Sequence, residues 1–309
     1  MIVHIGTHKT GTTSIQETLQ SNRDKLAKQG ILYPRTDREP WPNLPKHTSV
    51  YSAIRKGDEN ILESERRALL DEFKESGCST IIISEEGLSE PNQNSIDFFK
   101  YFQNSFDIDV ICYLRRQDYF IESLYNQFVR ERGRKESRSI LMFKDGLDVK
   151  KRLDYFSILN EWKTISSHVR ALDFDKEVKE HGLLNSFFNN LGISGLELTD
   201  SLKNPSPDMR LILTIARLNR YGINFDLSRI SRASKRIENS GMFVKKKYIL
   251  GKKERIKIIE EWCEINEKLS ESYRINFTES LPNDEDGLAS EDPSWEYCLA
   301  LMGELSRIK

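Results

Sequence analysis

The chain has 309 residues, which fits one large α/β domain or one such domain with an added helical part. Lys and Arg (47) nearly balance Asp and Glu (48), and a net charge of −1 argues against whole-surface attraction to nucleic acid. No apolar run approaches the roughly 20 residues of a membrane-spanning helix, and four dispersed cysteines indicate neither a zinc framework nor a disulfide scaffold. We therefore expect a soluble cytoplasmic protein without a transmembrane segment or a nucleic-acid partner.

The chain begins with the pattern of a phosphate-binding loop. In MIVHIGTHKTGTTS, a β-branched run ends at Gly6, and a loop leads through Gly11 into a predicted helix. This order places backbone N–H groups and the positive end of a helix dipole around one anion. The Walker A pattern has Lys and then Ser or Thr after its second glycine, whereas this chain has Thr12 and Thr13 there and carries Lys9 inside the loop. The loop therefore indicates a phosphate geometry other than that of Mg·ATP.

Strands and helices alternate along most of the chain. β-branched and apolar runs predict strands at 2–5, 30–34, 80–84, 108–114 and 169–174. Helical spacing of apolar residues predicts helices at 13–29, 50–54, 62–77, 96–102, 117–128, 183–191, 211–218 and 256–273. This alternation favours an α/β fold with a doubly wound parallel sheet flanked by helices.

Proline-rich segments interrupt this pattern without marking a domain boundary. A surface loop is expected at 35–45 and a turn at 204–207, and the sequence contains no internal repeat and no convincing linker. We therefore expect one domain over 1–309, with a nucleotide-binding core over about 1–200 and a mainly helical part over about 201–309.

A second anion-binding pattern occurs in VICYLRRQDYFIESLYNQF. The strand at 108–114 leads to Arg115, and Ser123 stands eight residues later, about two turns into the next helix. Together with THKTGTTS, this segment resembles sulfotransferases that use 3′-phosphoadenosine-5′-phosphosulfate (PAPS), which carry a lysine followed by S/T-G-T-T and the same Arg and Ser spacing. The resemblance covers about residues 1–130 and is greater to bacterial, carbohydrate-directed members. The aromatic residue common after the loop threonines is Ser14 here, and the glycine-rich C-terminal nucleotide motif is missing.

The resemblance implies a P-loop NTPase-like fold and a PAPS-dependent sulfotransferase activity. The sulfuryl group would pass from PAPS to an acceptor hydroxyl on a carbohydrate, and adenosine 3′,5′-bisphosphate would leave without a metal. The residues that would hold the 5′-phosphosulfate are His8, Lys9, Thr10, Gly11, Thr12 and Thr13. Arg115 and Ser123 would hold the 3′-phosphate, with Arg116 as an alternative to Arg115. Lys9 is the first catalytic candidate, because its ammonium would stabilise charge on the departing phosphate.

Three residues are candidates for the general base that an acceptor hydroxyl requires as it attacks sulfur. Glu85 and Glu86 follow a buried strand, at the edge where open α/β sheets gather their active sites. Acidic residues in this position also stabilise the start of a helix. His47 follows the proline-rich loop, although a lone histidine is more often a packing residue. The five histidines show no metal-ligand spacing.

Two other functions stay open at this point. A P-loop kinase or NTPase is disfavoured by Thr12 and Thr13, and a nucleotide-binding protein without activity is the second alternative. The basic stretches at 130–138 and 245–253 are either solvated surface or a means of attracting an anionic glycan, and closure over the nucleotide is a third interpretation of 245–253.

Overall fold

The computed structural model describes residues 1–35, 44–90, 93–198, 206–277, 280–282, 288 and 293–308. Most of the loop expected at 35–45 and the first half of the turn expected at 204–207 lie outside these residues. The chain divides into two compact units whose segments interleave. The first unit comprises Met1–Arg115, Lys151–Leu202 and Glu264–Glu279, and the second comprises Arg116–Lys150, Lys203–Cys263 and Ser280–Lys309. The single domain with a helical part after residue 200 stays a prediction.

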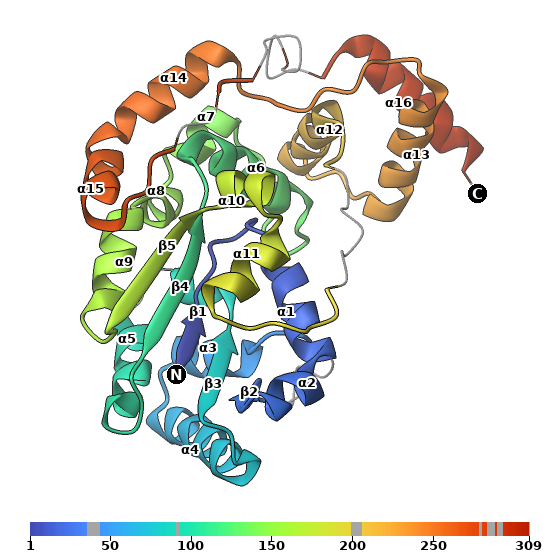
Figure 1. Cartoon of the computed structure of the whole chain (residues 1–309). Helices are drawn as coiled ribbons and strands as arrows, with labels where there is room; N and C mark the ends of the chain where they lie inside the picture. Colours follow the sequence, from blue (N-terminus) through green and yellow to red (C-terminus); the bar gives the residue numbers. More distant parts are fainter. Residues whose placement is uncertain are drawn as a thin grey trace. The chain divides into compact units, whose positions relative to one another are not determined.

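A five-stranded parallel sheet forms the centre of the first unit (Figure 1). In spatial order its strands are β2 (Ile31–Leu32), β3 (Thr80–Ser84), β1 (Ile2–His4), β4 (Asp109–Leu114) and β5 (His168–Asp173). On β1, Val3 lies opposite Ile83 of β3 and Val110 of β4. The chain fills one side of β1 and then the other, so the sheet is doubly wound and the expected fold class is confirmed.

Helices cover both faces of this sheet, so side chains on both sides of the central strands are buried. This is why these strands are nearly continuous apolar runs in the sequence. Ile82 and Ile83 of β3 belong to different cores, as the alternation of side chains along a strand requires. The core around Ile83 draws residues from α3 (Thr48–Lys56), α4 (Glu59–Ser76), α5 (Gln93–Lys100), the short η2 (Tyr101–Asn104), α9 (Tyr155–Lys163) and α15 (Cys263–Tyr273). The core around Ile82 draws residues from α1 (Thr12–Ser21), α2 (Arg23–Lys28), α10 (Phe174–Glu180) and α11 (Leu183–Asn190).

Two of the predicted helices are interrupted. The helix predicted at 13–29 is divided into α1 and α2 at Asn22, whose side chain donates to the Thr18 carbonyl (2.9 Å) and pairs with both backbone polar groups of Glu197. The helix predicted at 256–273 is divided into α14 (Lys252–Glu261) and α15 at Trp262. Apolar spacing continues across both breaks, so periodicity could not locate them.

The second unit is largely helical in its described residues. Its helices are α6 (Gln117–Arg130), α7 (Ile140–Lys144), α12 (Met209–Arg220), α13 (Leu227–Ser240), α14 and α16 (Trp295–Arg307), and α8 (Leu147–Leu153) crosses into the first unit. α13 packs against α16, and Ser234 and Tyr297 share a buried hydrogen bond of 2.8 Å between them. Among the described residues, none of the helices combines the length and apolar character that crossing a membrane requires.

A buried network of charged side chains joins α14 to α6. Arg255 of α14 pairs with Asp118 of α6 at 2.7 Å and also pairs with Glu122. Arg116 holds the other oxygen of Asp118 at 2.7 Å, and the backbone N–H of Ile249 donates to Glu122 at 2.6 Å. Because these side chains are almost completely buried, each charge depends on its partners for the solvation it has lost.

Candidate functional site

The β1–α1 loop, residues 5–11, follows the central strand of the sheet. Lys9 (φ 68°) and Gly11 (φ 71°) both take the left-handed conformation, which is uncommon for a lysine. Such residues turn neighbouring N–H groups toward one side, as in anion-binding nests. Thr10 donates its hydroxyl hydrogen to the Thr7 carbonyl (2.7 Å), and Thr7 donates to the Tyr113 carbonyl (2.9 Å). Thr10 can therefore offer an anion its backbone N–H, because its hydroxyl is committed to the loop.

The first turn of α1 is suited to a negative charge. Its N-cap, Gly11, supplies no side-chain acceptor, and the turn contains no acidic residue. The N–H groups of Thr12 and Thr13 are among those that an α-helix leaves without an internal partner, and the positive end of the helix dipole lies beside them. Gly11 needs glycine for its positive φ, and a Cβ there would also force the side-chain end of Leu183 on α11 to move.

His4 of β1 packs against the start of the loop. Its Nδ1 lies 2.8 Å from the Ser84 hydroxyl, and a Cβ at Gly6 would lie only 2.6 Å from its Nε2. Burial lowers the pKa of His4 to about 4, so the imidazole is neutral near pH 7. His4 is therefore a packing residue between β3 and the start of the loop.

At the end of β3, two glutamates share one lysine. Lys46 Nζ lies 2.8 Å from a carboxylate oxygen of Glu86 and 3.4 Å from one of Glu85. Gln16 of α1 donates to the other oxygen of Glu86 at 3.2 Å. Glu85 is only 2% exposed and also accepts the N–H of Gly87 (3.2 Å). The hydrogen bond from Gln16 therefore links this carboxylate pair to the helix that begins at the loop.

The two carboxyl groups are driven apart in pKa. Burial, with the neighbouring negative charge of Glu86, raises the pKa of Glu85 to about 7. Burial also opposes ionisation of Glu86, but the Lys46 ammonium, together with hydrogen bonds from the backbone and from Gln16, outweighs it and lowers the pKa of Glu86. One member thus stays ionised, while the other exchanges a proton near neutral pH, which is the arrangement expected of an acid–base group.

His47 lies against β3. It is 1% exposed, its Nδ1 accepts the Ser84 N–H at 3.0 Å, and its ring packs edge-on against Tyr33 with centroids 4.7 Å apart. Because Nδ1 accepts, the neutral ring carries its proton on Nε2, which is the wrong form to take a proton from a substrate. These contacts give His47 a packing role, and its role as a base stays a prediction.

The two arginines that follow β4 have different surroundings. The side chain of Arg115 is 23% exposed; its Nε donates to Asp175 (2.8 Å), and its guanidinium lies 5.6 Å from the Phe174 ring centroid. Arg116 is 4% exposed and belongs to the buried network on α6. Arg115 is therefore the better placed for an anion. Ser123 lies on α6 in the second unit, and its pairing with Arg115 stays a prediction.

Sequence reasoning missed two contributors to this edge. Lys46 precedes His47 in the chain and belongs to no recognisable sequence motif. It reaches Glu85 and Glu86 because its segment lies along β3, where the His47 N–H donates to the Ser84 carbonyl (3.1 Å). Glu90, just after η1 (Glu86–Ser89), contacts His8 of the loop at 3.2 Å. Neither residue has a spacing that indicates its partner. Within the described ranges, no three His, Cys, Asp or Glu side chains form a group able to hold a metal ion.

Comparisons with known proteins give few matches. No protein-family model matches the chain. An uncharacterized protein of Archaeoglobus fulgidus is 29% identical over 204 residues, which cover 62% of this chain and 53% of that protein. The chain thus spans about half the length of this curated relative. Among solved structures, a sulfotransferase from Alicyclobacillus acidocaldarius is similar over 74% of this chain and 96% of that one, with 16% identity and a TM-score of 0.42.

Proposed function

We propose that this protein is a PAPS-dependent sulfotransferase that acts on a hydroxyl group of a carbohydrate and releases adenosine 3′,5′-bisphosphate. The observation that carries the proposal is the presence, at one edge of the sheet, of a lysine-bearing loop suited to anions and a buried glutamate that titrates near neutrality. Gln16 and Glu86 connect the two through α1. A cation and a base on neighbouring strands are what sulfuryl transfer to a hydroxyl requires.

The donors at this edge fit a nucleotide with two separate anionic groups. The N–H groups of the loop and of the first turn of α1, together with Lys9, suit the 5′-phosphosulfate. Arg115, partly exposed at the end of β4, suits the 3′-phosphate together with Ser123. Mg·ATP fits less well, because Thr12 occupies the position of the Walker lysine, although Thr13 keeps a hydroxyl at the metal-holding position.

The proposed chemistry divides its roles between two side chains. PAPS supplies the activated sulfuryl group. As the bond from the acceptor oxygen to sulfur forms and the bond from sulfur to the 5′-phosphate oxygen breaks, Glu85 takes the proton of the acceptor hydroxyl. The ammonium of Lys9 offsets the charge that gathers on the departing phosphate.

Glu85 is the strongest of the three base candidates. Its raised pKa makes it a better proton acceptor than an ordinary surface carboxylate while leaving it partly ionised at neutral pH. Glu86 is held ionised by Lys46 and is a weaker base for that reason. A carbohydrate acceptor is supported by the resemblance of both motifs to bacterial, carbohydrate-directed sulfotransferases.

Ligand-induced thermal stabilisation tests the nucleotide. Adenosine 3′,5′-bisphosphate is expected to raise the melting temperature in a concentration-dependent way, because a ligand that binds only the folded state stabilises it. Mg·ATP at the same concentration serves as the matched competitor. Stabilisation by Mg·ATP alone would contradict the proposal and support a P-loop kinase or NTPase.

Transfer of the ³⁵S label from PAPS to a panel of glycans tests the reaction itself. We expect a labelled glycan and the release of adenosine 3′,5′-bisphosphate in equal amounts. Binding of the bisphosphate without transfer to any hydroxyl acceptor would instead support a nucleotide-binding protein that lacks activity. Transfer to non-carbohydrate hydroxyls alone would contradict the acceptor class but not the sulfotransferase activity.

A further inference from the structure

The Glu90 carboxylate, to which the proposed chemistry gives no role, joins the β1–α1 loop to two helices. One of its oxygens lies 3.2 Å from His8 Nε2 in the loop and accepts from Arg152 of α8 at 2.6 Å. Its other oxygen accepts the Tyr51 hydroxyl of α3 at 2.6 Å. All four residues belong to the first unit. A single carboxylate therefore connects the loop, α3 and α8.

This carboxylate is a permanent acceptor. Burial opposes its ionisation, but contacts with His8, Arg152 and Tyr51 hold the pKa of Glu90 well below its usual range. The side chain of Arg152 is 11% exposed, so its bond to Glu90 is partly shielded from water. Glu90 is thus ionised at every working pH, which makes it unsuitable as a general base and suitable as a fixed anchor.

The anchor determines how His8 is oriented. An ionised carboxylate only accepts, so the Nε2 of His8 must carry a hydrogen and donate it to Glu90. A carboxylate partner of this kind fixes both the tautomer and the direction of an imidazole ring. Residue 8 is therefore held by its side chain at the point where the loop enters the left-handed conformation of Lys9.

A left-handed lysine needs such restraints. A non-glycine residue in this conformation is strained and persists only where its surroundings over-determine it. On the far side of Lys9, the bond from Thr10 to Thr7 closes the loop on itself. On the near side, the contact between His8 and Glu90 ties the loop to the rest of the unit.

We propose that Glu90 is a positioning residue that acts through His8 to hold the β1–α1 loop in its anion-binding conformation. The proposal rests on the proposed function in one respect, because the anion that reports on the loop is the 5′-phosphate of adenosine 3′,5′-bisphosphate. Its effect is local: the 5′ end of the nucleotide depends on Glu90, and the 3′ end does not.

The test compares two nucleotides by isothermal titration calorimetry on the full chain. Adenosine 3′,5′-bisphosphate engages the loop, whereas adenosine 3′-monophosphate lacks the 5′-phosphate. We expect Glu90→Ala and His8→Ala each to weaken binding of the bisphosphate about tenfold, the effect of losing one hydrogen bond to a charged group. Binding of the monophosphate is expected to stay within about twofold of wild type, a difference too small to count as a lost hydrogen bond.

A double-mutant cycle and a matched control complete the experiment. If Glu90 acts through His8, the double variant is no weaker in bisphosphate binding than either single variant. Tyr51→Phe removes a donor from the other oxygen of the same carboxylate, and we expect it to leave bisphosphate affinity unchanged. His8→Ala removes the same contact from the loop side, so the test stands even if Glu90→Ala does not fold.

The outcomes separate this proposal from the proposed function. Bisphosphate affinity that is equal in wild type and variants overturns the positioning role and leaves the sulfotransferase proposal intact. Equal losses for both nucleotides also overturn it, since they indicate a general structural effect. A wild-type protein that binds no bisphosphate overturns the proposed function and this proposal with it.

Discussion

Lys9 combines a strained backbone with the side chain expected at the centre of the chemistry. Its φ of 68° costs an L-residue about 1–2 kcal/mol, which glycine avoids. Lys9→Gly is therefore expected to raise the free energy of unfolding by about 0.5–1 kcal/mol, after the extra entropy of an unfolded glycine is counted. The same change is expected to lower sulfuryl transfer at least about 100-fold.

Urea unfolding and ³⁵S transfer assays measure the two effects of Lys9→Gly. Arg274 is the matched control, because it is exposed, lies in the same unit and also has a positive φ of 57°. Arg274→Gly is expected to gain similar stability while keeping full activity. Undiminished transfer by Lys9→Gly would remove Lys9 from the reaction.

If Glu85 is the general base, activity is expected to depend on pH in a specific way. A base works only when deprotonated, so the rate is expected to fall as the pH drops below about 7, the raised pKa of this carboxyl group. Lys46 lowers that pKa, so Lys46→Met is expected to move the acid limb of the pH–rate profile to higher pH. Glu85→Gln is expected to reduce the rate about 10²–10⁴-fold across the profile.

The stability of the protein reports on the same carboxyl group. Its folded-state pKa is raised above 4.5, so the stability it contributes is fully present below pH 4.5 and is lost as the pH rises through about 7. Glu85→Gln is expected to lack this decline in urea unfolding. If Lys46→Met does not shift the acid limb of the pH–rate profile, a group other than Glu85 is the base.

Individual contacts of the site were the part least accessible to sequence reasoning. The loop glycines, Lys9 and Glu85 follow strand ends that the apolar runs predicted, and the structure brings the Glu85 pair next to α1. Glu90 stands 82 residues from His8, and a contact across that distance depends on how β1 and β3 pair. No local rule supplies such pairings.

At the scale of elements, the buried network around Arg255 predicts a large loss of stability. Arg255→Met leaves Asp118 and Glu122 buried with one partner fewer, and breaking such a pair costs about 3–5 kcal/mol. Lys257→Ala, an exposed lysine on the same helix, is the control and is expected to change stability by less than about 0.5 kcal/mol. Equal unfolding midpoints in urea for both variants would show that α14 does not depend on this network.

The sequence predicted strands more reliably than helix boundaries. The runs at 80–84 and 108–114 became β3 and β4, because a short, β-branched and mostly apolar run is typical of a parallel strand buried on both faces. The break at Asn22 depends on backbone partners on Glu197, which is distant in sequence. Periodicity records which face a helix buries, and that face continues across the break.

At the scale of the whole molecule, the order of strands and helices was sufficient to predict the doubly wound sheet. The division into two interleaved units was not predicted, because the segments that join each unit are far apart in the chain. The segment 116–150, for example, reads as a continuation of the alternating pattern, although it belongs to the second unit. Local patterns carry no signal for such long-range grouping.

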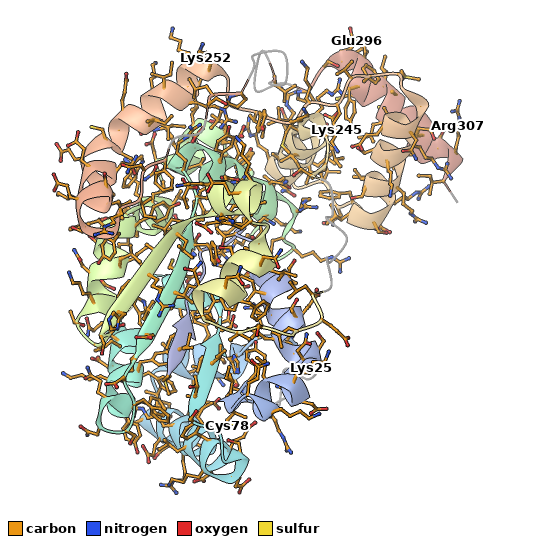
Figure 2. All side chains as sticks on the ribbon, in the orientation of Figure 1. Lys25, Cys78, Lys245, Lys252, Glu296 and Arg307 are labelled. Atoms are coloured by element: carbon orange, nitrogen blue, oxygen red, sulfur yellow. The ribbon has the colours of Figure 1, made fainter. Side chains whose placement is uncertain are left out.

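Charge is unevenly distributed along the chain. The segment 227–253 contains nine Lys and Arg residues and one Glu. Figure 2 labels two of these lysines, Lys245 and Lys252. Since the whole chain has a net charge of −1, the remainder carries −9. On α13, Arg229, Arg232 and Arg236 are exposed at helical spacing. Arg229 donates to the carbonyls of Leu305 and Ile308, and Arg236 lies 3.7 Å from a carboxylate oxygen of Glu304 on α16. Lys252 and Lys253 begin α14, where the helix dipole disfavours cations.

Because of this basic segment, we expect the protein to bind a phosphate-bearing matrix even above the sequence pI of about 6.6, where its net charge is negative. At pH 7.5 and low salt, we expect the protein to be retained on phosphocellulose and released as salt screens the interaction. The double variant with Arg232→Glu and Lys235→Glu is expected to elute at a lower salt concentration than the wild type. The control, Lys56→Glu with Lys74→Glu, makes the same change in net charge on exposed residues of the first unit. Equal shifts in both double variants would mean that retention follows net charge, and a shift confined to the first pair would locate it on the basic segment.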